Sequence, residues 1–240
     1  MNKTVSETIR MITEIKGIIS GKQELEIVIA PSFVSLHPAE IAAQGTPIQI
    51  AAQNVFHEEN GPFTGEVSAA MLADVGCRYV IVGHSERREL FGETDQVVNK
   101  KIRSILENEL GPLLCIGESA VQREQGKAFE VVENQMREGL RGVSEVDASQ
   151  VIIAYEPVWA IGTGETATPQ VAQEVHHFLR EKLAIIFRKD VSQKIRLVYG
   201  GSVNKENIKE MMTQPDIDGV LVGAASLETK SFLDIIYYNE

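Results

Sequence analysis

Two side chains that are suited to acid–base chemistry follow apolar, strand-like segments of this sequence. His84 comes two positions after the segment 79–82 (YVIV), and Glu156 comes directly after the segment 151–155 (VIIAY). A carboxylate at the end of a buried strand loses hydration, which raises its pKa and makes it a usable base. A histidine that begins a helix feels the positive end of the dipole, which favours a neutral imidazole that can polarise a carbonyl oxygen. On position alone, a buried ion pair of Glu156 and a structural His84 bonded to a loop carbonyl are the alternatives.

Glycine-containing segments follow three of the strand-like segments. Residues 200–202 (GGS) and 223–224 (GA) come after the last two of them, where backbone N–H groups often hold a phosphate group. Residues 160–164 (AIGTG) come after the stiff and bulky Pro157 and Trp159 and form a small, apolar tip. A segment of this composition can close over a ligand as a unit and exclude water. An ordinary loop is the alternative.

The elements that must position these residues alternate along the whole chain between short apolar runs and helical periods. A T-x-x-E capping box predicts a helix that begins at Thr4 and stops at Gly21. Its predicted apolar face carries Val5, Ile9, Ile12 and Ile19. Thr168 followed by proline predicts the start of another helix. The predicted strands are 26–30, 48–53, 79–82, 112–116, 151–155, 195–199 and 220–222, and further helices are predicted near 38–43, 66–76, 96–106, 128–140, 205–212 and 231–238.

The predicted strands are apolar throughout rather than alternating, which indicates a parallel sheet that is covered on both faces. Repeated strand–helix units then leave two architectures, a doubly wound sheet or a (β/α)8 TIM barrel. No linker or low-complexity segment divides the chain, so residues 1–240 are expected to form one domain. A closed barrel needs eight strands. Only seven are predicted here, and the missing one belongs before the helix at Thr4.

Composition excludes several classes of protein and partner. The chain has 240 residues, with 23 Lys and Arg against 34 Asp and Glu, for a net charge of −11. This charge argues against nonspecific binding to nucleic acid or to an anionic membrane. The longest apolar stretches reach about eight residues, well short of the roughly 20 that span a bilayer. Two cysteines without a pattern, and a start without a secretory signal, lead us to expect a cytoplasmic protein. No zinc-like spacing is present, so no metal is expected.

Five segments of the sequence resemble the triosephosphate isomerase family. They occur in the same order as in the family, and the match extends over essentially the whole chain. They are 61–72 (GPFTGEVSAAML), 82–93 (VGHSERRELFGE), 154–164 (AYEPVWAIGTG), 197–203 (LVYGGSV) and 221–227 (LVGAASL). The resemblance implies a TIM barrel that interconverts dihydroxyacetone phosphate and D-glyceraldehyde 3-phosphate through an enediolate, in glycolysis and gluconeogenesis. It also implies a cytoplasmic homodimer that needs no cofactor. The pairing of a glutamate base with a neutral histidine is a known property of this family.

The resemblance also implies a role for each matching residue. Glu156 would move the proton, His84 would polarise the carbonyl, and Glu86 would support them. Backbone N–H groups would hold the phosphate at Gly162, Ser202, Gly223 and Ala224. The loop of residues 56–65, from Phe56 to Gly65, would reach into the partner subunit with Thr64 near its tip.

The sequence departs from the family pattern at its start. The family opens with a strand that ends in N-x-K-M-N, whose Asn and Lys contact the substrate, whereas this chain starts at Met1-Asn2. Lys3 lies beyond the motif and does not replace the missing lysine. We therefore expect an open barrel that lacks its first strand, and a natural start upstream of Met1.

Two smaller departures concern the phosphate site and the lid. Ala224 stands where the family usually has a second glycine, and a positive φ there would be strained. Glu165 ends the lid where a basic residue is common.

Two other functions remain as alternatives to the isomerase. One is a catalytically impaired barrel remnant that binds phosphate ligands or a partner, because the family's N-terminal Asn and Lys are absent. The other is a different phosphate-binding barrel enzyme, or a glycosidase that uses Glu86 and Glu156 as a carboxylate pair.

Overall fold

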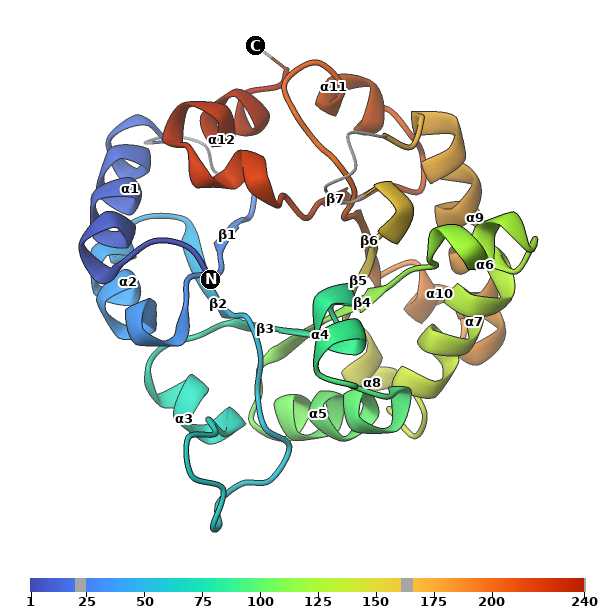
Figure 1. The fold of residues 1–240 in the computed structure, drawn as a ribbon, viewed down its shortest axis with the longest axis horizontal. Helices are drawn as coiled ribbons and strands as arrows, with labels where there is room; N and C mark the ends of the chain where they lie inside the picture. Colours follow the sequence, from blue (N-terminus) through green and yellow to red (C-terminus); the bar gives the residue numbers. More distant parts are fainter. Residues whose placement is uncertain (20–24, 161–165, 240) are drawn as a thin grey trace.

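The structure of the protein is a computed structural model that describes residues 1–19, 25–160 and 166–239. Within these residues, parallel strands form one sheet whose order follows the sequence from β1 to β7. The sheet curls into a ring, and the helices surround it (Figure 1). The strands are β1 Ile27–Ile29, β2 Ile48–Ala52, β3 Tyr79–Val82, β4 Gly111–Ile116, β5 Ile152–Tyr155, β6 Arg196–Tyr199 and β7 Gly219–Val220.

Most of the helices connect consecutive strands, as parallel pairing requires. The α-helices are α1 Val5–Ile18, α2 Leu36–Ala43, α3 Ala69–Asp74, α4 Ser85–Leu90, α5 Asp95–Glu107, α6 Ala120–Glu124, α7 Ala128–Gly139, α8 Glu145–Ala148, α9 Pro169–Ile186, α10 Lys189–Ser192, α11 Ile208–Met211 and α12 Thr229–Ile236. The 3₁₀ helices are η1 Phe33–Ser35, η2 Val158–Ala160 and η3 Ala224–Leu227. The prediction of a TIM barrel with seven parallel strands is confirmed in the part of the chain that the structure describes.

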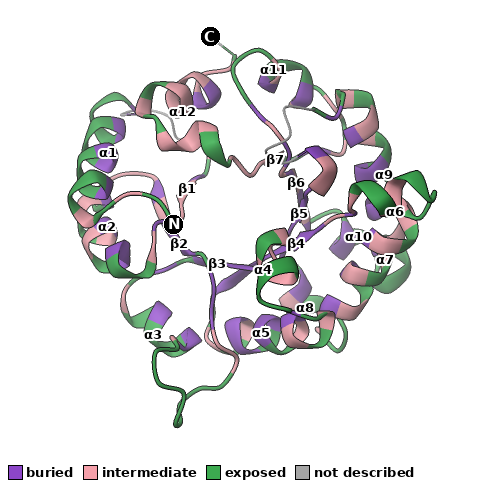
Figure 2. Ribbon diagram, viewed as in Figure 1, coloured by how far each residue is buried: buried purple, intermediate pink, exposed green. Residues whose placement is uncertain are grey.

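The core has two layers because alternate side chains of each strand point to opposite faces of the sheet. On β4 and β5, Leu113, Cys115, Ile152 and Ala154 face the inside of the ring. Their neighbours in sequence pack outward against the surrounding helices and form the larger cluster. Every residue of β3, β4 and β5 is buried, which confirms the prediction of a sheet covered on both faces (Figure 2).

The two ends of the described sheet are less covered than its middle. β1 pairs with β2 and β7 pairs with β6, and the described residues form no ladder between β1 and β7. Both residues of β7 are partly exposed, as are two of the three in β1. This arrangement agrees with the expected open barrel.

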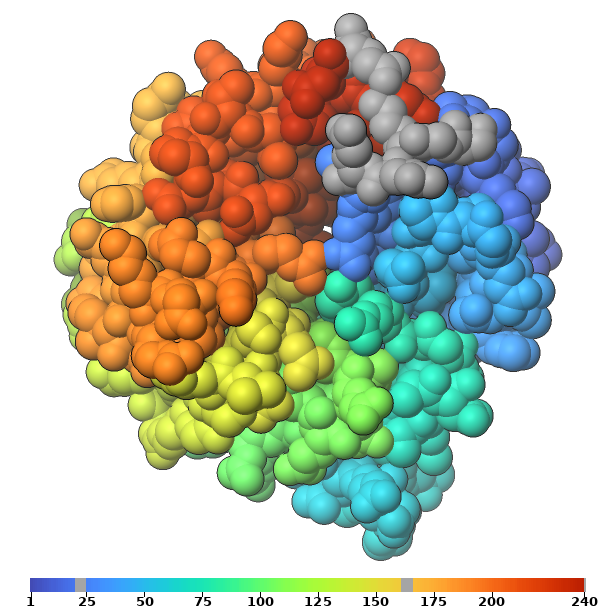
Figure 3. Space-filling model, turned by 180° about the vertical axis from the view of Figure 1, so that it is seen from behind, coloured from blue at the N-terminus to red at the C-terminus, as the bar shows by residue number. Residues whose placement is uncertain are grey.

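The first and last helices of the described chain, α1 and α12, contact each other beside this opening. Thr229, at the start of α12, donates a hydrogen bond of 2.6 Å to Glu14 of α1, and Tyr237 donates one of 2.9 Å to the carbonyl of Ile18. From behind, the earliest and latest segments of the chain lie side by side at the top of the molecule (Figure 3). Contacts between α1 and α12 therefore hold the ring together where the strands do not pair.

The two helix starts predicted from caps are confirmed, and the predicted apolar face of α1 is confirmed at Ile12 and Ile19 but wrong at Ile9. Thr4 caps α1 with both bonds of the capping box, and Thr168 caps α9 with proline in the first turn. On α1, however, Ile9 is exposed, while Met11 and Ile15 are buried with Ile12. The predicted stop at Gly21 lies outside the described residues.

Candidate functional site

The structure brings Glu156 and His84 together at the carboxyl ends of β5 and β3. Glu156 Oε1 lies 3.3 Å from His84 Nε2, and Glu156 Oε2 accepts a bond of 3.3 Å from the backbone N–H of Ser85. The carboxylate is buried, with 2% of the residue exposed, while the imidazole is about one-third exposed. Residues 72 positions apart in sequence thus face each other at one rim of the barrel, where the catalytic residues of such folds lie.

The position of His84 selects one form of its ring. His84 is the N-cap of α4, as predicted, and its Nδ1 accepts a hydrogen bond of 3.3 Å from the backbone N–H of Glu86. An acceptor nitrogen carries no proton, so the neutral ring has its proton on Nε2. This N–H points toward Glu156 and is the donor that a substrate carbonyl oxygen would meet.

Burial raises the pKa of Glu156 above the ordinary glutamate value. The nearby imidazole of His84 works in the opposite direction, as do hydrogen bonds from the thiol of Cys115 and from Ser85. We attribute the net increase to lost hydration, since almost none of the carboxylate meets water. A base with a raised pKa binds a proton more strongly, so the environment suits proton abstraction.

Glu156 occupies space that is free only because two neighbouring residues are glycines and have no side chain. A Cβ on Gly117, which follows β4, would lie 1.7 Å from the backbone oxygen of Glu156. A Cβ on Gly200, which follows β6, would lie 2.8 Å from Glu156 Cγ. Sequence analysis assigned Gly200 to a phosphate segment, but its contact in the structure is with the buried glutamate.

The carboxylate of Glu86 lies away from the pair. Its side chain is 74% exposed, and its Oε2 is 3.9 Å from His84 Nδ1. The contact that Glu86 makes with His84 is through its backbone N–H. A supporting role of the Glu86 carboxylate stays a prediction.

The residues expected to hold phosphate lie on the loops after β6 and β7. Ser202 is partly exposed, and its carbonyl accepts a bond of 2.9 Å from Asn207. Gly223 caps η3, which begins at Ala224, and both residues are exposed. Ala224 does not have a positive φ, so the predicted strain is absent. Gly162, Glu165 and all of the predicted lid except Ala160 lie outside the described residues.

Known proteins match the chain along its length. The family model of triosephosphate isomerase matches residues 1–239. A triosephosphate isomerase of Endomicrobium trichonymphae is 48% identical over 240 residues, which are 100% of this chain and 96% of the relative. Those of Citrifermentans bemidjiense and Thermoanaerobacter pseudethanolicus are 50% and 49% identical over 238 residues, covering 99% of this chain and 95% and 96% of the relatives.

The chain belongs to the triosephosphate isomerase family. It is thus an aldose–ketose isomerase by family, and the family's reaction interconverts dihydroxyacetone phosphate and D-glyceraldehyde 3-phosphate. The same match decides against the glycosidase alternative. It also supports the TIM barrel that the parallel sheet forms.

This triosephosphate isomerase barrel contains another buried carboxylate, Glu118. It was not predicted from the sequence. It is fully buried, and its Oε1 accepts bonds from Tyr155 (3.0 Å), Trp159 (2.8 Å) and Arg123 (3.0 Å). Trp159 lies in η2, just before the predicted lid. The sequence contained a signal for this residue. Glu118 follows Gly117 at the end of the fourth predicted strand, just as polar residues follow the other predicted strands.

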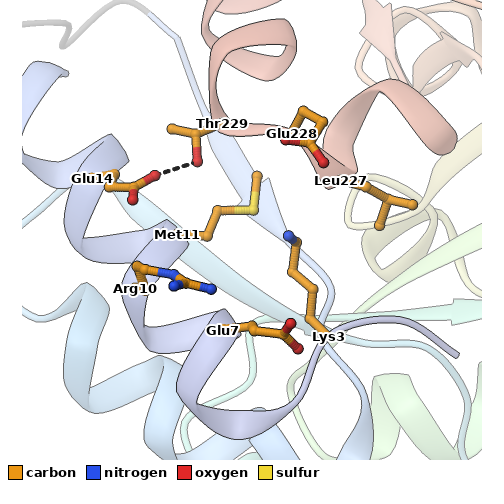
Figure 4. A pocket seen from close by; sticks show the side chains of 8 residues that line it. All are labelled: Lys3, Glu7, Arg10, Met11, Glu14, Leu227, Glu228 and Thr229. Atoms are coloured by element: carbon orange, nitrogen blue, oxygen red, sulfur yellow. Dashed lines mark hydrogen bonds between the residues drawn. The ribbon is translucent and has the colours of Figure 1, made fainter.

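Lys3, which we do not expect to replace the lysine of the family, lies just before α1. Its ammonium group points into a cavity of about 300 Å³ between α1 and the junction of η3 with α12 (Figure 4). The residues that line this cavity are Lys3, Glu7, Arg10, Met11, Glu14, Leu227, Glu228 and Thr229.

The described residues offer neither a cluster of metal ligands nor a membrane-spanning helix. They contain no group of three His, Cys, Asp or Glu side chains that could hold a metal ion. In the same part of the chain, each helix falls short of the length or apolar character needed to cross a membrane.

Proposed function

We propose that this chain performs the reaction of its family with Glu156 as the base and His84 as the group that polarises the carbonyl. The observation that carries the proposal is the 3.3 Å contact between Glu156 and His84 Nε2 at the carboxyl end of the barrel. A buried carboxylate and a neutral N–H donor side by side match the two needs of proton transfer next to a carbonyl group.

In the proposed mechanism, Glu156 removes a proton from the hydroxyl-bearing carbon next to the carbonyl and returns it to the former carbonyl carbon. The hydroxyl proton moves in the opposite direction between the two enediolate oxygens, which His84 Nε2 serves. The N–H of His84 Nε2 donates to the carbonyl oxygen and stabilises the negative charge that develops in the enediolate. For this, the carboxylate must exchange its contacts with His84 and Ser85 for a contact with substrate. The two 3.3 Å bonds are long, so little is lost in the exchange.

The phosphate group of the substrate would bind to backbone N–H groups of Ser202, Gly223 and Ala224, with Gly162 added when the lid closes. The exposure of Gly223 and Ala224 leaves these groups accessible to an anion. Glu118 supports lid function indirectly, because it holds Trp159 where the chain enters the lid.

We further propose that residues 1–240 form a single domain that acts as a cytoplasmic homodimer through the loop 56–65. The loop extends away from the barrel (Figure 1), and its tip around Phe63 and Thr64 is exposed. The rings of Phe56 and Phe63 contact each other in a tilted arrangement, with their centroids 4.6 Å apart, and give the loop a small core of its own. Its base is anchored by Lys101, which donates a bond of 2.6 Å to Asn54.

The direct test is an isomerase assay of the chain and of two variants. We expect Glu156→Gln to lower kcat roughly 10²–10⁴-fold and His84→Gln roughly 10²–10³-fold, with KM nearly unchanged. Matched controls are Glu174→Gln and His177→Gln, which replace exposed residues of α9 and should leave kcat unchanged. Turnover by Glu156→Gln at the wild-type rate would contradict the assignment of the base.

The alternative to the isomerase is a catalytically impaired barrel that binds phosphate ligands without turnover. A wild-type chain that binds phosphoglycolate but does not isomerise either triose phosphate would support the remnant and reject the isomerase.

A further inference from the structure

The side chain of Arg88 turns from α4 back to the ends of two strands of the barrel. Its Nε donates to the carbonyl of Gly83 at 2.7 Å, and its Nη2 donates to the carbonyl of Cys115 at 3.3 Å. Its Nη1 donates to Asp95 Oδ1, at the start of α5, at 2.6 Å. One guanidinium thus connects the loop after β3, strand β4 and α5.

The two carbonyl groups that Arg88 binds belong to the segments that carry the reacting pair. Gly83 directly precedes His84, and the thiol of Cys115 bonds to the Glu156 carboxylate from inside the barrel. The next residue of β4 accepts the backbone N–H of Glu156 at 2.7 Å. Arg88 therefore fixes the distance between the backbone at Gly83, which carries His84, and the end of β4, which contacts Glu156.

The turn at Gly83 is packed against the guanidinium and depends on it. Gly83 has a φ of +69°, and a Cβ there would lie 2.9 Å from Arg88 Nη2 and 3.1 Å from the Cys115 oxygen. With its positive φ and these close contacts, the backbone of Gly83 can adopt few other conformations while the guanidinium is in place. Without it, two strand-end carbonyls lose their donors, and the turn that aims His84 can relax.

An arginine suits this position better than a lysine. The rigid guanidinium offers donors in three directions, whereas an ammonium is a single point on a flexible stem. The side chain of Arg88 is 16% exposed and that of Asp95 is 18% exposed, so the pair also compensates a mostly buried charge.

We propose that Arg88 is a positioning residue for isomerisation, because it fixes the His84 ring relative to the Glu156 carboxylate without touching substrate. The proposal rests on the function proposed above for these two residues. Displacing a catalytic group by about 1 Å can cost about 10²-fold in rate. The loss should fall on kcat, because Ser202, Gly223 and Ala224 lie after β6 and β7 and do not contact Arg88.

The test compares Arg88→Met and Arg88→Lys with Arg137→Met, which removes an exposed arginine of α7. We expect Arg88→Met to lower kcat about 10²-fold, with KM and the inhibition constant of inorganic phosphate within about twofold of wild type. Arg88→Lys should recover part of the rate, because it can restore one of the two carbonyl contacts. Arg137→Met should behave as wild type.

A second readout separates positioning from stability and from the proposed function itself. NMR signals of the His84 ring report its tautomer and surroundings, and they can be measured even if the chain does not turn over. We expect these signals to shift in Arg88→Met and not in Arg137→Met. If the wild type is inactive, the proposed function fails while the His84 signals still decide the role of Arg88.

Two results would overturn the proposal. One is a wild-type kcat together with unshifted His84 signals in Arg88→Met. The other is a fall in kcat that urea unfolding explains fully by loss of folded protein. If Arg88→Met does not fold, the same two criteria apply to Arg88→Lys.

Discussion

Glu156 shows how one residue can serve chemistry at a cost to stability. Its burial raises the pKa of the carboxyl group, so the ionised form is less favourable in the folded protein than in the unfolded chain. The contacts from His84, Ser85 and Cys115 offset only part of this cost. A site that needs a buried base is therefore expected to reduce the free energy of unfolding near neutral pH.

We predict that Glu156→Gln is more stable than wild type at pH 7. A raised folded pKa means that the protonated carboxyl favours the folded state below the ordinary value of 4.5, and this benefit is lost as pH rises through the folded pKa. The advantage of the variant should therefore appear above that pKa and disappear below about pH 4.5. Urea unfolding of both proteins across this pH range measures the difference.

Exposed Glu174 provides the control for this comparison. Glu174→Gln changes the charge equally, and its stability difference from wild type should stay small at every pH. A Glu156→Gln variant that is less stable than wild type at pH 7 would mean that the bonds to His84 and Ser85 outweigh burial.

At the scale of elements, the carboxyl end of β4 is held by neighbours on both sides. Gln135 of α7 accepts from the backbone N–H of Gly117 at 2.7 Å and donates to its carbonyl at 3.2 Å, much as an adjacent strand would. The backbone of Glu156 passes so close to Gly117 that no side chain fits there. Strand β4 thus determines where the base emerges from β5.

We predict that Gly117→Ala lowers the free energy of unfolding by about 3 kcal/mol or more, because the new Cβ would overlap a backbone oxygen rather than a movable side chain. The activity of the folded fraction should fall as well, since the backbone of Glu156 must shift. Urea unfolding and the isomerase assay measure the two effects.

Gly17→Ala is a matched control with the opposite expected sign. Gly17 lies in α1, and a Cβ there meets nothing within 4 Å, so alanine should add roughly 0.5–1 kcal/mol. Equal stability of the Gly117 and Gly17 variants would show that the strand ends can separate at little cost.

At the scale of the whole molecule, apolar side chains are exposed on the loops that follow β1, β2 and β3. Val34, Phe63, Leu90 and Phe91 are 75%, 39%, 71% and 67% exposed. Apolar groups that gather along one rim are typical of an interaction surface. The loop 56–65, which carries Phe63, projects from this rim and could insert into a second copy of the chain. This supports the proposed homodimer.

We predict that Thr64→Arg weakens the dimer at least about tenfold, because a buried, unpaired charge costs several kcal/mol. Thr64 is exposed in the described chain, so the fold itself should not change. Sedimentation at a series of dilutions measures the dissociation constant. Val146→Arg, at a 78% exposed position on α8 before β5, is the control and should leave the dimer intact. A wild-type chain that remains a monomer at micromolar concentration would refute the dimer.

The sequence by itself determined the order of the strands and of the longer helices and offered the two principal candidates, because these depend on local chemistry, but it did not predict the short helices α6, α8 and α10. Apolar runs identified each of the seven strands of the described residues to within a few positions, and caps identified the starts of α1 and α9. Position after a strand made His84 and Glu156 candidates, and the resemblance to the family then implied their roles. Local patterns did less well for the face of α1, since burial of Met11 and Ile15 depends on what α1 packs against.

Only the tertiary structure decided how the site is assembled. The distance between His84 and Glu156, the burial of Glu118, the need for glycine at 117 and 200, and the reach of Arg88 all depend on how neighbouring strands are brought into register. These contacts join residues that are far apart in sequence, and no local propensity encodes them. The sheet creates them when it curls, because it brings the carboxyl ends of its parallel strands to one rim.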